Sequence, residues 1–259
     1  MTAALDDIVA YLDDLLATRD TPDYGGALNG LQLENGGTVS KVAAAVDFSS
    51  RTVEGAIVAG ATLLLVHHGM FWGGAQPIRG PSYRRLRRLI EHDVAVYASH
   101  LPLDRHPTLG NNALLARALG LLPSREFARY KAISVGVSGE SDVETAELID
   151  RARAFASREG GAVVVGGDTQ AGRRTRRWAL CTGAGASSDT MREAIELGAD
   201  TLIVGEGPHH TAVDAADAGV VVIYAGHYAT ETLGVRALAQ HASERFGVPW
   251  SFVAAPTGL

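Results

Sequence analysis

Six side chains of types that bind metal ions follow three apolar stretches of the sequence. They are His67 and His68 after the run 61–66, His100 at the end of 94–100 with Asp104 beyond it, and His227 at the end of 221–227 with Glu231 beyond it. Imidazole and carboxylate groups together suit zinc, iron, manganese, cobalt or nickel, whereas magnesium and calcium prefer oxygen ligands alone. The pattern predicts a divalent-metal site at strand ends, where parallel α/β folds place their chemistry.

The spacing of His100 from Asp104 is repeated by His227 and Glu231, with the carboxylate four residues after the histidine. One such pair is weak evidence, because a lone histidine is more often a hydrogen-bonded structural residue. Two pairs after similar stretches are stronger evidence. Six candidate ligands exceed the four of a tetrahedral site, so we expect two ions that share a bridging carboxylate. Two ions can hold a hydroxide at neutral pH and polarise a substrate oxygen, which favours hydrolysis.

The elements that must position these side chains occur twice in the sequence. Residues 60–66 (Gly-Ala-Thr-Leu-Leu-Leu-Val) match residues 198–204 (Gly-Ala-Asp-Thr-Leu-Ile-Val), and a serine pair precedes each at an equivalent place, at 49–50 and 187–188. We expect a strand, a helix and a strand at 41–47, 49–59 and 61–66, and again at 177–182, 188–197 and 201–204. Strands that alternate with helices in this way predict βαβ units.

The fold class expected from this repeat is α/β, with two similar α/β lobes from an internal duplication and largely parallel sheets. The first lobe is expected at 1–123 and the second at 173–259, with the metal site in the cleft between them. The segment 124–172 fits neither copy and is interpreted as a bridge, with a strand near 132–137 and a helix near 143–158.

Composition excludes several classes of protein. The chain has 259 residues, of which 46% are hydrophobic and 20% charged, as in a globular protein with a real core. A net charge of −6 gives no reason to expect nucleic acid or an anionic membrane as a partner. Residues 1–17 predict an amphipathic helix and not a signal peptide, and no apolar run is long enough to span a membrane. The single cysteine, Cys181, fits a reducing compartment, so we expect a cytoplasmic protein.

Four further features admit both a structural and a functional interpretation. They are the arginines 84, 85, 87 and 88, the arginines 173, 174, 176 and 177, the pair His209-His210, and the glycine-rich stretch 183–188. Each arginine cluster fits a solvated helix face or a subunit contact, or else a phosphate site. The histidine pair fits a solvated helix start, or a role near substrate. The glycine-rich stretch fits a tight turn between strand and helix, or a phosphate cradle at a helix N-terminus.

The sequence around the candidate ligands resembles the Nif-three-like dinuclear-metal family, also catalogued as GTP cyclohydrolase type 2 homologues. The stretches that carry the resemblance are His-His-Gly-Met-Phe-Trp at 67–72, Ser-His-Leu-Pro-Leu-Asp at 99–104, Gly-Asn-Asn at 110–112 and Gly-His-Tyr-Ala-Thr-Glu at 226–231. Asn-Gly-Leu-Gln at 29–32 is similar to the family's N-terminal signature, and Thr-Gly at 182–183 and Gly-Glu at 205–206 fall in order between. The resemblance spans essentially the whole chain.

The resemblance implies two intertwined α/β lobes and a toroidal homohexamer with a pair of divalent metal ions in each chain. It also implies a set of metal ligands: His67, His68, Asp104, His227 and Glu231, with Glu231 bridging. His100 would lie beside the ions as a further ligand or as a proton-handling catalytic group. The chain would be a short member that lacks the domain inserted in long members, and its ending at 251–256 departs from the family's acidic-polar pattern.

Two functions are consistent with such a centre. The first is a metal-dependent hydrolase of a small, nucleotide-like substrate, and the alternative is a non-catalytic protein that buffers metal or regulates a partner. The two histidine–carboxylate pairs are expected to differ, because Pro102 restricts the backbone of Leu101. A helix is expected to carry His227 and Glu231, but not to carry His100 and Asp104.

Overall fold

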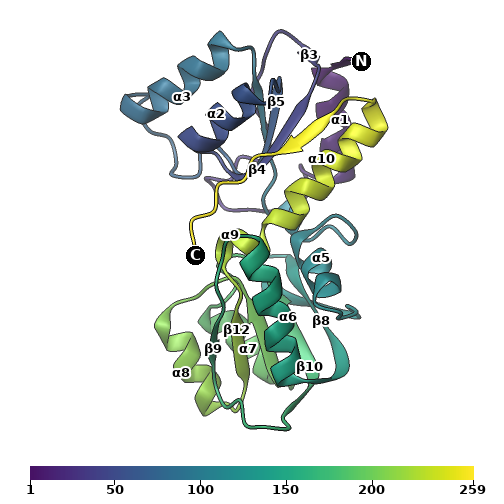
Figure 1. The fold of residues 1–259 in the computed structure, drawn as a ribbon, viewed down its shortest axis with the longest axis vertical. Coiled ribbons are helices and arrows are strands. Elements are labelled where there is room, and N and C mark those ends of the chain that lie inside the picture. Colours follow the sequence, from purple (N-terminus) through teal and green to yellow (C-terminus); the bar gives the residue numbers. More distant parts are fainter. The chain divides into compact units, whose positions relative to one another are not determined.

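The computed structural model describes all residues, 1–259, and divides the chain into two compact units (Figure 1). Unit 1 comprises residues 1–103 and 234–255, and unit 2 comprises residues 104–233 and 256–259. These boundaries differ from the expected ones, since the segment 124–172 belongs to unit 2 and most of the chain after 233 returns to unit 1. The return follows from strand pairing between Trp250–Phe252 and Val42–Ala44, which has no local signal in the sequence.

Unit 1 is built around a five-stranded sheet of order β13-β4-β5-β6-β2. Its elements are β1 (Ala3–Ala4), α1 (Leu5–Leu15), β2 (Gly30–Leu33), β3 (Thr38–Val39), β4 (Val42–Asp47), α2 (Ser50–Val58), β5 (Leu63–His68), α3 (Gly80–Glu91), β6 (Ala95–Ala98) and β13 (Trp250–Phe252). Two further helices cross the unit boundary: α4 (Leu101–Asp104) ends with the first residue of unit 2, and α10 (Thr232–Phe246) begins with the last two residues of that stretch of unit 2. The pairs β13–β4, β4–β5 and β5–β6 are parallel, and only β2 runs antiparallel to its neighbour β6. This sheet is largely parallel, as expected.

The apolar runs of unit 1 form strands because both of their faces are covered. Residues 42–46 and 63–66 are all buried, which explains why they show no alternation of apolar and polar residues. Helix α2 begins after a capping box in which Ser49 and Thr52 bond to each other's backbone N–H groups. The expected N-terminal amphipathic helix is present as α1, with Leu5, Ile8 and Leu12 buried.

Unit 2 is built around a six-stranded sheet of order β7-β8-β10-β11-β12-β9. Its elements are α5 (Asn111–Ala118), β7 (Arg125–Tyr130), β8 (Ile133–Glu144), α6 (Thr145–Arg158), β9 (Val164–Gly166), β10 (Arg174–Cys181), α7 (Ser188–Glu196), β11 (Thr201–Val204), α8 (His209–Asp217), β12 (Val221–Tyr224) and α9 (His227–Thr230). Only β10–β11 and β11–β12 are parallel pairs, whereas β7–β8, β8–β10 and β12–β9 are antiparallel.

The expectation of largely parallel sheets is therefore wrong for unit 2, whose sheet is mixed. The cause lies in the segment interpreted as a bridge, which supplies three of the six strands. A tight turn with a positive φ at Lys131 reverses the chain between β7 and β8, and a hairpin of this kind is antiparallel by construction. Strand β8 then continues to Glu144, well beyond the short strand expected at 132–137.

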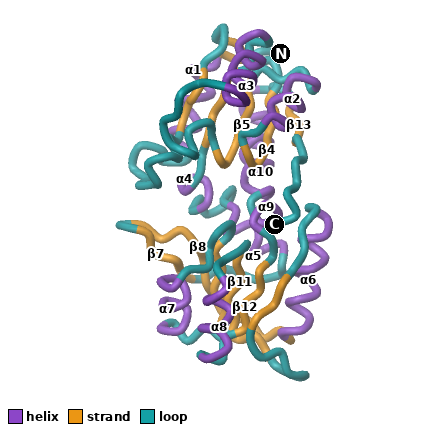
Figure 2. Tube along the Cα trace, turned by 90° about the vertical axis from the view of Figure 1, so that its left-hand side faces the viewer, coloured by secondary structure: helices purple, strands orange, loops and turns teal.

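Helices cover both faces of the unit 2 sheet. One core cluster joins residues of α5 and α6 to Trp178, Leu180 and Ile203. The other joins residues of α7 and α8 to Ala179, Cys181 and neighbouring strand residues of the opposite face. Figure 2 shows α7 and α8 on one side of β11 and β12, with α6 on the other. This double cover explains the continuous apolar runs of the central strands.

The start of α7 repeats the start of α2. Ser187 and Thr190 form a capping box as Ser49 and Thr52 do. The Thr190 hydroxyl also donates to the carbonyl oxygen of Gly185 at 2.8 Å, as the Thr52 hydroxyl donates to that of Asp47 at 2.7 Å. The same strand-to-helix turn therefore occurs once in each unit.

No helix of the structure combines the length and the apolar character that crossing a membrane would require.

Candidate metal centre

Three histidines of unit 1 lie together where two neighbouring strands end. His67 and His68 are the last residues of β5, and His100 follows the end of β6, which pairs with β5 in parallel. Strand ends of a parallel pair meet at the same edge of the sheet, so the side chains converge. All three are buried, and one ring nitrogen of each lies within 4.8 Å of those of the others. A divalent ion with imidazole ligands fits such a cluster.

Each of these histidines is oriented through its Nδ1 atom. His67 Nδ1 lies 2.8 Å from the carbonyl oxygen of Ser99, His68 Nδ1 lies 2.8 Å from Asp47 Oδ1, and His100 Nδ1 lies 2.8 Å from Asp23 Oδ1. A carbonyl oxygen only accepts, so His67 donates from Nδ1 and its neutral ring carries the lone pair on Nε2. Histidines that bind metal are usually held in this way, through an outer hydrogen bond that fixes the tautomer and the ring plane.

Asp23 holds His100 and the chain around it. Its carboxylate accepts hydrogen bonds from the backbone N–H groups of Tyr24 and Leu101 and from Asn29 Nδ2, in addition to His100. Burial raises the pKa of this carboxyl, but the hydrogen bonds and charge of His100, with those of Asn29 and the Tyr24 backbone, outweigh it and leave the pKa below its usual value. Asp23 is therefore ionised beside His100 near neutral pH.

Unit 2 brings a histidine into contact with two carboxylates. His227 and Glu231 lie at the two ends of the short helical segment α9, and His227 Nε2 is 3.2 Å from Glu231 Oε2. On the other side of the ring, His227 Nδ1 is 2.8 Å from Glu206 Oε1. Burial lowers the pKa of His227, but hydrogen bonds and charge from Glu231 and Glu206 prevail and raise it to about 9. A position that holds a proton this firmly suits a metal cation in place of the proton.

Asp104 is buried in unit 2 and is fixed by two adjacent asparagines. Asn111 Nδ2 donates to Asp104 Oδ1 at 2.8 Å, and Asn112 Nδ2 donates to the Asp104 carbonyl oxygen at 3.2 Å. Asn112 also accepts from the Thr182 backbone N–H at 2.8 Å, which ties this corner to the end of β10. Burial and the charges of Asp104 and Glu231 raise the pKa of Cys181, so its thiol remains protonated.

A glycine makes room for Glu231. Gly183 has a φ of +61°, and a Cβ at this position would lie 2.0 Å from Glu231 Oε1 and 3.4 Å from His227 Nε2. Its backbone N–H donates to Thr230 Oγ1 at 3.0 Å. The stretch 183–188 is thus the tight turn between β10 and α7, and it borders the unit 2 ligands.

The helical turn at Pro102 corrects one sequence-based expectation. Residues Leu101–Asp104 form the one-turn helix α4, and Leu103 N–H donates to the His100 carbonyl oxygen. Pro102 lies in the first turn, where its missing N–H leaves no intrahelical hydrogen bond unmade. A helical segment therefore follows His100 as well as carrying His227.

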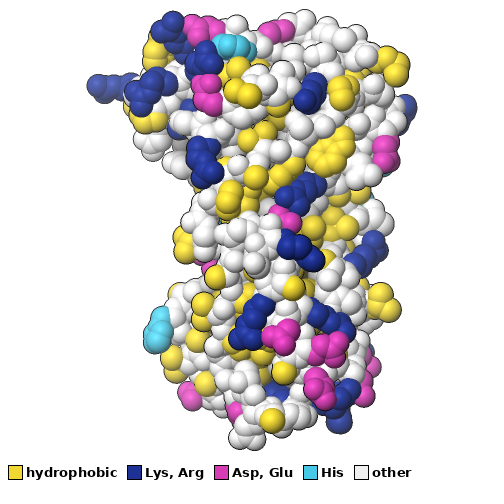
Figure 3. All heavy atoms as spheres, viewed as in Figure 1, with side chains coloured by type: hydrophobic (Ala, Val, Ile, Leu, Met, Phe, Trp, Pro, Cys, Tyr) yellow, Lys and Arg dark blue, Asp and Glu magenta, His cyan; other side chains and the backbone are white.

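The other features singled out in the sequence lie outside these two ligand sets. His209 and His210 begin α8 and are exposed, with His210 Nε2 3.2 Å from Ser188 Oγ. Figure 3 shows basic side chains gathered over α3. There Arg87 pairs with Glu91 and Arg88 with Glu54, beside a groove of about 490 Å³.

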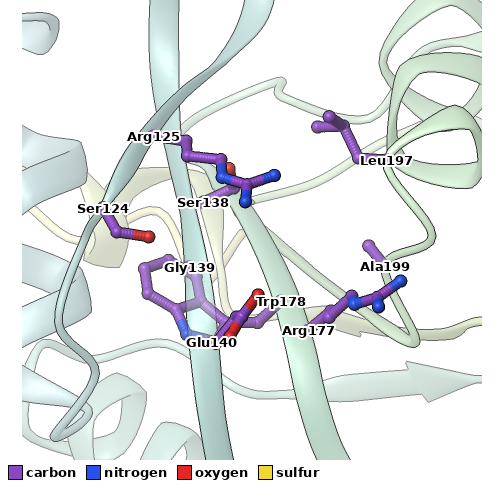
Figure 4. Close-up of a pocket in the computed structure, with 9 residues that line it drawn as sticks. All are labelled: Ser124, Arg125, Ser138, Gly139, Glu140, Arg177, Trp178, Leu197 and Ala199. Carbon is purple, nitrogen blue, oxygen red and sulfur yellow. The ribbon is translucent and has the colours of Figure 1, made fainter.

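Two cavities of unit 2 differ in what they can hold. The cavity of Figure 4, between Arg125, Trp178 and Leu197, has a volume of about 30 Å³, which is too small for a metabolite. The other has a volume of about 300 Å³ and is lined by Glu206, His209 and Tyr224 among others. It borders the carboxylate that holds His227.

The carboxylates that hold the histidines were not among the candidate residues identified from the sequence. Two of them had a usable signal, because Asp47 ends the expected strand 41–47 and Glu206 follows the expected strand 201–204 closely. Asp23 had none, since it lies in a loop far along the chain from His100.

The fold is that of an α/β protein, and its histidine and carboxylate clusters are of a kind that could hold a metal ion. The family model described as Duf34/NIF3 (NGG1p interacting factor 3) matches residues 3–257, and the chain belongs to this family. Two relatives carry the name "GTP cyclohydrolase 1 type 2 homolog". That of Deinococcus radiodurans is 41% identical over 98% of this chain and 94% of its own length. That of Halobacterium salinarum is 40% identical over 98% of both chains.

Solved structures agree with the fold. TTHA1606 from Thermus thermophilus aligns with a TM-score of 0.84 and 38% identity, over 99% of this chain and all of that one. The protein ybgI, titled as of unknown function, aligns with a TM-score of 0.88 and 34% identity over the same shares.

Proposed function

We propose that the chain binds two divalent metal ions and uses them to hydrolyse a small, nucleotide-like substrate. In this proposal the ligands are His67, His68, Asp104, His227 and Glu231, with Glu231 bridging the ions. The observation that carries it is the anchoring of four histidines by oxygen acceptors at Nδ1, each at 2.8 Å. Side chains fixed in this way are prepared to bind through Nε2. The ions are zinc, iron, manganese, cobalt or nickel by ligand type.

Bound ions would polarise the substrate and lower the pKa of an attacking water. The chain's own residues supply orientation and proton transfer. Asp47 and Glu206 fix the rings of His68 and His227. Asp23 accepts the Nδ1–H of His100, which directs Nε2 toward the other histidines. We assign to His100 the removal of a proton from the attacking water.

The relatives' names support a nucleotide-like substrate, since they are called homologues of a GTP cyclohydrolase. The second candidate is a non-catalytic protein that stores metal or regulates a partner. Its support is the position of His100 within 4.8 Å of His67 and His68, because a sixth ligand would saturate the coordination shell.

One experiment separates the two functions. The metal-loaded protein is incubated with a broad library of metabolites, and Asp104→Ala, which removes a proposed ligand, serves as control. Consumption of one compound by the wild-type protein alone supports the hydrolase. No turnover, together with rapid exchange of bound ions for added ones, supports the metal-storage function.

The proposal includes a closed ring of six chains in the cytoplasm, and an origin of the two units by duplication. The duplication is supported by the matching stretches 60–66 and 198–204 and by the identical capping boxes that precede them. Light scattering should report a mass of about six chains. A monomer at micromolar concentration would contradict the ring and leave the metal ligands unaffected.

A further inference from the structure

Two aromatic side chains of unit 1 stand against the histidine cluster and remain half exposed. The Trp72 ring centroid lies 4.7 Å from that of His68 and 4.6 Å from that of His100. The Tyr24 centroid lies 5.7 Å from that of His100 and 6.4 Å from that of Trp72. Tyr24 is 53% exposed and Trp72 is 43% exposed. We call these two side chains the aromatic pair.

The loops that carry the aromatic pair are locked to each other. Gln32 Nε2 donates to the carbonyl oxygens of Ala27 and Leu28, while its Oε1 accepts from the Met70 backbone N–H at 2.6 Å. One amide therefore fastens the loop after Tyr24 to the loop before Trp72.

Backbone packing brings the same loops into contact. A Cβ on Gly26 would lie 2.7 Å from the Trp72 carbonyl oxygen, and a Cβ on Gly69 would lie 2.4 Å from the Gln32 side chain. The backbone that carries the aromatic pair is thus held in place before a ligand arrives, which lowers the entropy lost on binding.

The groups around the aromatic pair favour binding of a flat aromatic ring of a ligand over binding of a sugar. The polar groups nearest in the chain are engaged elsewhere: Asn29 with Asp23 and the His100 backbone, Asp23 with four donors, and Gln32 with the loop backbone. These three side chains are therefore not available to bind the hydroxyls of a sugar. Aromatic faces stack on any planar heteroaromatic ring without such groups.

Resting on the proposed function, we propose that Tyr24 and Trp72 form the subsite for the heteroaromatic base of the substrate. The base stacks on Trp72 with Tyr24 at its side. This position brings the group of the substrate that is hydrolysed to the histidine cluster. The substrate class is then a purine or a similar planar nitrogen heterocycle, and Trp72 determines specificity without binding metal.

Tryptophan fluorescence and calorimetry test this assignment. The chain has three tryptophans. Trp178 is buried and Trp250 is partly buried in β13, so Trp72 is the most accessible to an added ligand, and Trp72→Leu identifies its share of the quenching. The probe is guanosine 5′-monophosphate, and ribose 5-phosphate is the matched ligand without a base. We expect the nucleotide to quench emission saturably and the sugar phosphate to leave it unchanged.

Variants locate the effect. Trp72→Leu should weaken binding of guanosine 5′-monophosphate about tenfold in calorimetry, the size of one lost base–aromatic stack. Tyr24→Leu should weaken it less, and Tyr24→Phe should retain it. Tyr83→Leu is the matched control, because Tyr83 on α3 is 52% exposed, close to the 53% of Tyr24, but lies outside this cluster. Metal content should be equal in all variants.

Each other outcome overturns the assignment. Equal affinity of Trp72→Leu and wild type means that the base does not stack there. Loss of metal in Trp72→Leu means that the indole supports the ligands. A changed oligomeric mass in both leucine variants without a change in nucleotide affinity means that the aromatic pair is an interface between copies. Failure of the proposed function would be distinguishable from failure of this assignment. In that case the protein would bind no metal, or would show no turnover, while it still bound the base.

Discussion

The two ligand sets differ in where carboxylates lie around the imidazole rings: unit 1 has them at Nδ1 alone, and unit 2 has them at both ring nitrogens. In unit 1, Asp23 and Asp47 bind the Nδ1 atoms of His100 and His68, so negative charge lies behind the rings. In unit 2, Glu206 binds Nδ1 of His227 while Glu231 reaches its Nε2. A carboxylate behind a ring orients it, whereas a carboxylate at Nε2 competes with the ring for the same cation or proton. Unit 1 therefore offers a cation imidazole nitrogens, with the carboxylates on the far side of the rings. Unit 2 offers it a carboxylate directly, beside the imidazole nitrogen.

The largest expected effect is that of Glu231→Ala, because this change removes the carboxylate proposed to serve both ions. Elemental analysis of purified protein should show most of the metal lost, with up to two ions per chain in the wild type. Glu193→Ala is a control at a partly exposed carboxylate of α7. Unchanged metal in Glu231→Ala would exclude this residue from the centre.

His100→Ala should separate metal binding from catalysis. We expect it to keep more metal than His68→Ala or His227→Ala and to lose most of any hydrolytic activity, because its Nε2 is assigned to the proton. Metal content and turnover are measured on the same preparations. If His100→Ala loses as much metal as the other two, His100 is a full ligand.

The carboxylates behind the rings should have intermediate effects. Asp47→Ala and Glu206→Ala should each weaken metal binding about 10- to 100-fold, as loss of an outer hydrogen bond to a ligand does. Competition with a chelator of known affinity measures the change. Asp47→Asn should recover part of the affinity, because an amide oxygen still accepts from Nδ1 of His68. No recovery would indicate that charge, and not orientation, is what Asp47 contributes.

The last expected effect is a dependence of stability on pH that arises from His227 in unit 2. His227 has a pKa of about 9 in the folded protein, above its ordinary value of 6.5. Its protonated form stabilises the metal-free protein fully below pH 6.5, and this stabilisation is lost as pH rises through 9. The loss is on the order of 2 kcal/mol, after discounting for partial exposure. Urea unfolding at about pH 6.5 and about pH 9.5 measures it, and His227→Gln should remove the difference.

The sequence predicted the positions of the histidines because apolar runs and parallel strand ends are local signals. His67, His68 and His100 lie together for this reason. It did not predict the β7–β8 hairpin, whose turn at Lys131 has no glycine to mark it. It also did not predict the pairing of β8 with β10, because that contact is far apart in the sequence. It misjudged Pro102, whose ring is compatible with a first helical turn. The link from Asp23 to His100 spans 77 positions and has no periodicity to reveal it.

Gly183 gives the family resemblance a simple criterion. Two independent constraints meet at this residue, a left-handed backbone and a carboxylate oxygen where a side chain would begin. Any single-base change of its codon that alters the amino acid violates both, although every ligand is retained. A chain that keeps the histidines and carboxylates but carries another residue at position 183 is therefore expected to hold the Glu231 carboxylate in a different position, with a strained backbone at 183. The residue at that position therefore indicates whether a related chain that keeps the ligand residues also keeps their arrangement.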